Sequence, residues 1–131
     1  KIMISWLEKE SAIPWVIVLC IAVFIFYVSS VSFKAGQANY DFLPFIYHFS
    51  VFFLFGLFLM IALARGENSA FFFLATIIAI VYGIFDEIHQ IFVPGRSASV
   101  YDILVDSFGI FYAMLIYSIS IQYRKNGKIG N

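Results

Sequence analysis

Residues 42–64 read FLPFIYHFSVFFLFGLFLMIALA, and His48 is the only Asp, Glu, Lys, Arg or His among them. A helix needs about 20 predominantly apolar residues to cross the hydrocarbon core of a bilayer. This stretch is long enough and predicts a membrane-spanning helix. The fold of the chain follows from whether the rest of the sequence repeats the pattern.

The composition extends that expectation to the whole chain. Of 131 residues, 63% are hydrophobic, 21% aromatic and 12% charged, and the mean hydropathy is +0.94. A soluble domain of this length has too little interior to bury so many apolar side chains. The net charge is zero, which gives no basic field for a nucleic-acid partner. One cysteine, Cys20, excludes a disulfide within the chain.

Four apolar stretches meet the length requirement, at about 12–32, 43–64, 69–92 and 100–122. Short polar turns join the second stretch to the third and the third to the fourth, and no linker or repeat interrupts them. We therefore predict an all-α, polytopic protein with four transmembrane helices in a small bundle, and one membrane domain over 1–131. The residues from Arg124 to Asn131 are predicted to be a frayed polar tail. The first stretch exceeds a usual signal-peptide core, so we expect it to be retained.

The basic residues indicate the orientation. If the amino end is cytoplasmic, the cytoplasmic segments hold Lys1, Lys9, Arg65, Arg124, Lys125 and Lys128. The external segments then hold only Lys34 and Arg96. The positive-inside rule favours this topology, with both termini cytoplasmic in the cell membrane. Eight further polar residues then fall on or near the extracytoplasmic side: Asp41, His48, Asp86, Glu87, His89, Gln90, Asp102 and Asp106.

Two spans carry acidic stripes at that end. At 100° per residue, Asp86, Glu87 and Gln90 share an arc of about 100° with Gly83 and Ala79. Asp102, Asp106, Gly109 and Ala113 share roughly 60° on the last span. Small residues allow helices to approach closely in lipid, so we expect both stripes to face the bundle interior. The opposite faces carry residues suited to lipid: Phe71, Phe73, Ile77, Ile80, Phe108, Phe111 and Ile116.

Carboxylates at membrane depth are costly and mark a functional site or an internal ion pair. Two interpretations stay open here. Arg96 either meets an anionic ligand or bridges Glu87 and Asp102 in a structural network. Pro94-Gly95 is predicted to end the third helix and turn the chain.

The two histidines have separate expectations. His48 either donates to an acid across the bundle or lies at the interface. His89 points away from Glu87, nearer to Asp86 and Tyr82. A metal site from His48, Asp86, Glu87 and Asp102 is compatible with the ligand types. However, D-E-x-H-Q lacks the zinc spacing H-E-x-x-H, so we expect neither a metal nor a cofactor.

Residues 82–99, YGIFDEIHQIFVPGRSAS, followed by DILVD at 102–106 and Gly109, resemble the signature of the VanZ-like family. The resemblance extends over roughly residues 20–115 and includes YVSS at 27–30, HF at 48–49 and Gly56. Asp106 is a departure, because many members have Asn there. The family-pattern residues are His48, Glu87, Gln90, Pro94, Arg96, Asp102 and Gly109.

The resemblance implies an integral membrane protein linked to teicoplanin resistance, in which the drug accumulates less at the cell surface. On this basis we expect the chain to bind an amphiphilic antibiotic or membrane lipid through Arg96, Glu87, Gln90, Asp102, Asp86 and His48. Pro94, Gly95 and Gly109 are expected to be structural, and a homodimer is compatible with the sequence.

Three other functions stay open. The first is a membrane-embedded enzyme acting on a lipid or cell-wall-precursor headgroup, with Glu87, His48 or Asp102 as the catalytic candidates. The second is a small proton-coupled transporter. The third is a structural subunit that binds no ligand.

Overall fold

The computed structural model is all-helical over the residues that it describes, which are 2–9, 12–31, 42–66 and 69–129. A short helix, α1 (Ile2–Lys9), precedes four long ones. The long helices are α2 (Ala12–Ser30), α3 (Phe42–Ala64), α4 (Ser69–Ile91) and α5 (Val100–Ile129). Each of them is long and apolar enough to cross a membrane, which confirms the predicted class of a four-span α-helical membrane protein.

The predicted span boundaries are close to those observed, but both ends of the chain differ from the prediction. At the amino end, helix α1 was not predicted. The expected frayed tail was also wrong for Arg124–Ile129, because α5 continues as a helix through these residues. Hydropathy identifies apolar stretches that can span a bilayer. It does not identify α1 and the end of α5, because these are held by polar contacts with each other.

Those contacts centre on Glu8. Its carboxylate accepts hydrogen bonds from Arg124 Nη2 at 2.7 Å and from the Tyr117 hydroxyl at 2.9 Å. The same hydroxyl accepts the backbone N–H of Gly66 at 2.9 Å. Helix α1, the turn after α3 and the last turns of α5 are thereby joined. The resulting cluster fixes the end of the bundle opposite the acidic stripes.

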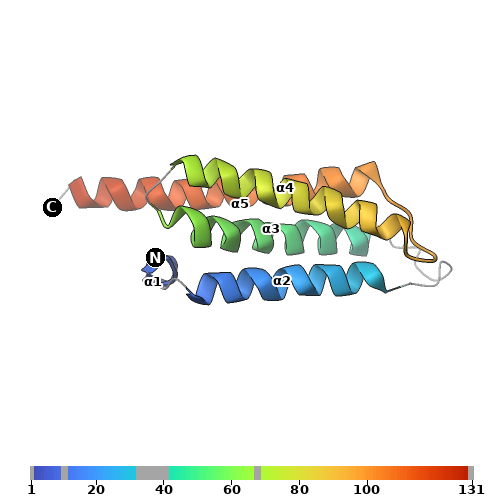
Figure 1. Cartoon of the computed structure of the whole chain (residues 1–131). Coiled ribbons are helices and arrows are strands. Elements are labelled where there is room, and N and C mark those ends of the chain that lie inside the picture. Colours follow the sequence, from blue (N-terminus) through green and yellow to red (C-terminus); the bar gives the residue numbers. More distant parts are fainter. Residues whose placement is uncertain (1, 10–11, 32–41, 67–68, 130–131) are drawn as a thin grey trace.

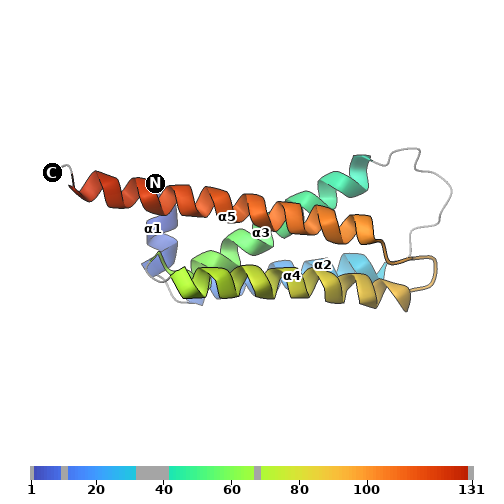
Figure 2. The same cartoon turned by 90° about the horizontal axis from the view of Figure 1, so that it is seen from above.

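Consecutive long helices run antiparallel (Figure 1). Helix α3 contacts each of the other helices that the structure describes. Helix α1 runs across one end of the bundle, where α5 extends beyond the other long helices (Figures 1 and 2). The end of α2, the start of α3 and the turn between α4 and α5 lie at the opposite end. This antiparallel order brings the acidic stripes of α4 and α5 to one end.

The two stripes face inward, as predicted. Ala79, Gly83, Asp86, Glu87 and Gln90 of α4 are buried. Asp106, Gly109 and Ala113 of α5 are also buried, and Asp102 is half-buried. The residues expected to face lipid are exposed, with the exception of Ile80, which packs against the core. The stripes also meet, since a Cβ added at Gly83 would lie 3.5 Å from Asp106 Oδ2.

Gly109 is the point of closest approach between α3 and α5. A Cβ at this position would lie 2.5 Å from the carbonyl oxygen of Phe49 and 3.0 Å from the amide nitrogen of Phe53. Both contacts are with backbone, which cannot rotate away. Gly56 lies in the same interface, but a Cβ there would meet only Ile110, at an ordinary 3.5 Å.

Gly109→Ala should therefore destabilise the bundle by about 2–3 kcal/mol, because α5 must move away from α3. Gly56→Ala is the matched control and should stay within about 1 kcal/mol of the parent, since alanine also favours the helix. Unfolding midpoints in detergent measure both variants. Equal midpoints for the two would contradict the close contact at Gly109.

Candidate functional site

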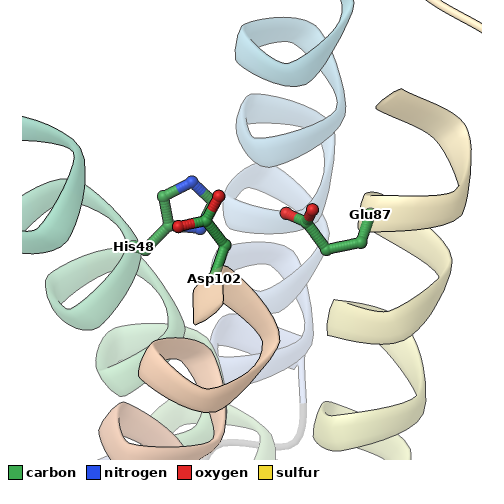
Figure 3. Close-up of side chains that lie close together, drawn as sticks. All are labelled: His48, Glu87 and Asp102. Atoms are coloured by element: carbon green, nitrogen blue, oxygen red, sulfur yellow. The ribbon is translucent and has the colours of Figure 1, made fainter. Parts of the chain in front are cut away.

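Three predicted site residues, each on a different helix, come together at the acidic end of the bundle. His48 lies in the second turn of α3, Glu87 near the end of α4 and Asp102 in the first turn of α5 (Figure 3). One ligand atom from each lies within 4.8 Å of the others. In Figure 3 the Glu87 carboxylate extends toward the other two side chains. Residues 54 positions apart in the sequence therefore share one site.

His48 is held by Asp106. Its Nδ1 lies 2.9 Å from Asp106 Oδ1, and the two residues are 5% and 1% exposed. This contact confirms the interpretation in which His48 donates to an acid across the bundle. Asp106 is one helical turn before Gly109, so the close approach of α5 to α3 makes the contact possible. Asp106 Oδ2 and the Tyr47 hydroxyl are buried without a hydrogen-bond partner among the described residues.

The α4 carboxylates are bound by neighbouring groups. Gln90 Nε2 donates to Asp86 Oδ2 at 3.0 Å and to Glu87 Oε1 at 3.1 Å. The backbone N–H of Ser99 donates to Glu87 Oε2 at 2.8 Å. Each Glu87 oxygen therefore has a donor, and the carboxylate is fixed in orientation.

Ser99 caps α5, and its Oγ accepts the backbone N–H of Asp102 at 3.3 Å. In an ordinary capping box, the side-chain carboxylate of Asp102 would accept a hydrogen bond from the backbone N–H of Ser99 in return. Glu87 accepts that N–H instead. Ser99 was not among the predicted site residues, although the pattern Ser-x-x-Asp at 99–102 is the signal for such a cap.

The turn before Ser99 is built as the sequence predicted. Helix α4 ends at Ile91, Gly95 has a φ of 80°, and Arg96 N donates to the carbonyl of Val93 at 3.1 Å. A proline followed by a glycine of positive φ is typical of a type II turn. Pro94 and Gly95 thus lie in the turn that joins α4 to α5.

The structure adds a contact of Arg96 that neither interpretation included. Its Nη2 donates to the carbonyl of Val28 at 2.8 Å, and its Nε donates to that of Val31 at 3.2 Å. These carbonyls lie at the end of α2, where a helix lacks internal donors. Arg96 therefore ties the α4–α5 turn to α2.

His89 also contacts α2 and lies outside the site. Its Nε2 is 3.0 Å from Ser30 Oγ, and its ring stacks on Phe26 with centroids 4.6 Å apart. Lys34 and Asp41, which the topology placed at the same end, lie outside the described residues. Among the site candidates, the structure thus brings His48, Glu87 and Asp102 together, with Asp86, Gln90 and Asp106 around them.

This arrangement can accept hydrogen bonds or bind a cation, because its free atoms are carboxylate oxygens and one imidazole nitrogen. The fold and the site define a small multi-pass membrane protein with a buried polar centre at one end of its bundle. A family model described as VanZ/LLP1 matches residues 14–121. The chain therefore belongs to the VanZ/LLP1 family. Searches of curated proteins and of solved structures return no significant match.

Arg96→Ala should lower the stability by about 2 kcal/mol, because the end of α2 loses two charge-assisted donors. Arg96→Lys should recover only part of this, since an ammonium cannot reproduce the planar fork. Unfolding midpoints and hydrogen exchange at residues 28–31 measure the effect. Lys125→Ala, at an exposed position of α5, is the control. Parent-like exchange at the end of α2 in Arg96→Ala would contradict the assigned contact.

Proposed function

We propose that this VanZ/LLP1 family protein binds the headgroup of an amphiphile at the His48–Glu87–Asp102 site. The family name links it to teicoplanin resistance. In the proposal, binding of the lipoglycopeptide or of a membrane lipid lowers the accumulation of the drug at the cell surface. The basic residues of the sequence favour an extracytoplasmic site, the side from which such a drug arrives.

One observation carries the proposal: polar side chains from three helices converge at one end of a bundle whose surface is apolar. Carboxylates within membrane spans are costly and mark functional sites by default. Asp102 is half-buried, so a headgroup can reach it, whereas Glu87 is 1% exposed. A headgroup that presents hydroxyl or ammonium donors would match these acceptors.

The surroundings suit the apolar part of an amphiphile. On α5, Tyr101 and Leu104 lie within two residues of Asp102 in sequence and are 62% and 59% exposed. On α4, Ile88 and Ile91 are 45% and 60% exposed. In the proposal, an acyl chain packs against exposed residues of one of these helices while its headgroup meets the acidic residues. Exposed apolar surface is ordinary for helices in lipid, so the polar site gives the specificity.

Arg96 has a supporting role in this proposal. Two of its donors are bound to α2 carbonyls, and they position the turn that carries Ser99. Loss of function in an Arg96 variant would therefore not identify a ligand contact. The informative substitutions are Asp102→Asn and Glu87→Gln, because each removes a charge and preserves the shape of the side chain.

Expression of the parent chain should lower the amount of labelled teicoplanin bound to cells, and Asp102→Asn should abolish that effect at equal membrane abundance. Glu87→Gln should do the same, whereas Lys125→Gln, an exposed charge change at the far end of α5, should behave as the parent. Labelled drug per cell and abundance on immunoblots are measured together. Full activity in both acidic variants would contradict the proposed site.

A second candidate, an enzyme acting on a lipid headgroup, is favoured by the His48–Asp106 contact. A buried carboxylate that orients an imidazole prepares it for proton transfer. Glu87 is the other candidate for acid–base work in the site. If this function is correct, purified chain should turn over a labelled lipid, and Glu87→Gln should still bind that lipid without converting it. If the parent chain binds the lipid without turnover, the enzymatic function is excluded and the first proposal is favoured.

A further inference from the structure

We infer that His48, Glu87 and Asp102 form a binding site for one divalent transition-metal ion, of the Zn²⁺ or Mn²⁺ type. The three residues offer one imidazole nitrogen and two carboxylate oxygens, all within 4.8 Å of one another. Imidazole suits zinc and its neighbours, and carboxylates suit manganese. The inference goes beyond the proposed function, because the ion requires no amphiphile to bind.

His48 is prepared as a metal ligand. Its Nδ1 is engaged by Asp106 Oδ1 at 2.9 Å, so the neutral ring carries its lone pair on Nε2. No hydrogen bond joins this Nε2 to another described residue, although the side chain is 7% exposed. Metal-ligating histidines commonly donate their other ring N–H to a carboxylate, which fixes the tautomer and the ring orientation. Asp106 supplies that contact here.

Glu87 is oriented in the same manner. The N–H of Ser99 and the amide of Gln90 each donate to one of its oxygens. A carboxylate oxygen accepts about two hydrogen bonds, so each oxygen keeps capacity for a metal. Ligating carboxylates are generally held by such outer hydrogen bonds. The donors thus fix Glu87 without consuming it.

Asp102 is the third ligand. Its carboxylate is available because Glu87 takes its place as the acceptor at the helix cap. The N–H of Ser99, its usual partner, is bound to Glu87 Oε2. No hydrogen bond or ion pair joins the Asp102 carboxylate to another described residue. Asp102 is half-buried, so this ligand lies at the open side of the site. The ion can enter the site from this open side, where a coordination position stays available for water or a ligand group.

The spacing is close to what a metal requires. Ligands about 2.1 Å from a tetrahedral ion lie about 3.4 Å apart, so a separation of 4.8 Å must shorten by about 1.4 Å. Rotation of Asp102 in the first turn of α5 can provide this movement. Three protein ligands with an open position resemble a catalytic rather than a structural zinc site.

The charge of the site also favours a cation. Among the described residues at this end, the carboxylates of Asp86, Glu87, Asp102 and Asp106 outnumber the side chains that can carry positive charge, which are Arg96 and, when protonated, His48 and His89. Burial of uncompensated carboxylates is costly. A divalent ion would neutralise two of them and would have the imidazole as a neutral ligand.

The full chain, purified in detergent and freed of metal with a chelator, should bind one Mn²⁺ that Zn²⁺ displaces. Electron spin-echo modulation of the bound Mn²⁺ should show ¹⁴N coupling from one imidazole. Asp102→Asn should weaken Mn²⁺ binding at least tenfold and, being half-buried, should leave the fold intact. Glu87→Gln should weaken it similarly, and His48→Asn should remove the ¹⁴N coupling.

Asp86→Asn is the matched comparison, because it removes the same charge from the same turn of α4 and shares the donor Gln90 with Glu87, but lies outside the three-ligand group. It should weaken Mn²⁺ binding less than Glu87→Gln does, and it should retain the stoichiometry and the ¹⁴N coupling. Absence of stoichiometric Mn²⁺ binding in the parent would overturn the inference. Equal losses in Asp86→Asn, Glu87→Gln and Asp102→Asn, or bound Mn²⁺ without ¹⁴N coupling, would also overturn it, since they indicate a diffuse counterion.

Discussion

The close contact between α5 and α3 at Gly109 is the constraint on which the rest of the structure depends. With no side chain at Gly109, α5 lies against the backbone at Phe49, the residue after His48. Asp106, one turn earlier on α5, then lies within 2.9 Å of the His48 ring. In lipid, helices associate through such packing and through interhelical hydrogen bonds rather than through the hydrophobic effect. Packing and polar pairing thus occur at the same place.

The four spans could be predicted because their signal is local. Each apolar stretch is long enough to cross a bilayer by itself. The observed helices begin and end within two residues of the prediction, except that α5 continues to Ile129. The short α1 and the polar end of α5 could not be predicted in this way. Both depend on Glu8, whose partners Tyr117 and Arg124 are more than 100 residues away.

The candidate site was partly predictable for a related reason. Helical periodicity placed Glu87, Gln90 and Asp102 on inward faces, and the structure agrees. The same arithmetic cannot give the rotation of one helix against another, so a contact of His48 with an acid across the bundle stayed one of two alternatives, and Asp106 was not identified as that acid. The contact of Arg96 with α2 was missed because backbone carbonyls have no sequence signature. Likewise, the three inferred metal ligands lie on three different helices, so no short sequence motif with a fixed spacing could indicate them.

The central claim is that His48 is positioned by Asp106 to face Glu87 and Asp102. Solid-state NMR on chain reconstituted in lipid, with ¹⁵N-labelled histidine and ¹³C-labelled aspartate, measures this contact directly. The chain has two histidines, so His89→Asn assigns the remaining ring to His48. A strong dipolar coupling between His48 Nδ1 and an aspartate side-chain carboxyl is the predicted result. It should be lost in Asp106→Asn, because residue 106 then no longer carries a labelled aspartate carboxyl. No coupling between that ring and any aspartate carboxyl would contradict the account.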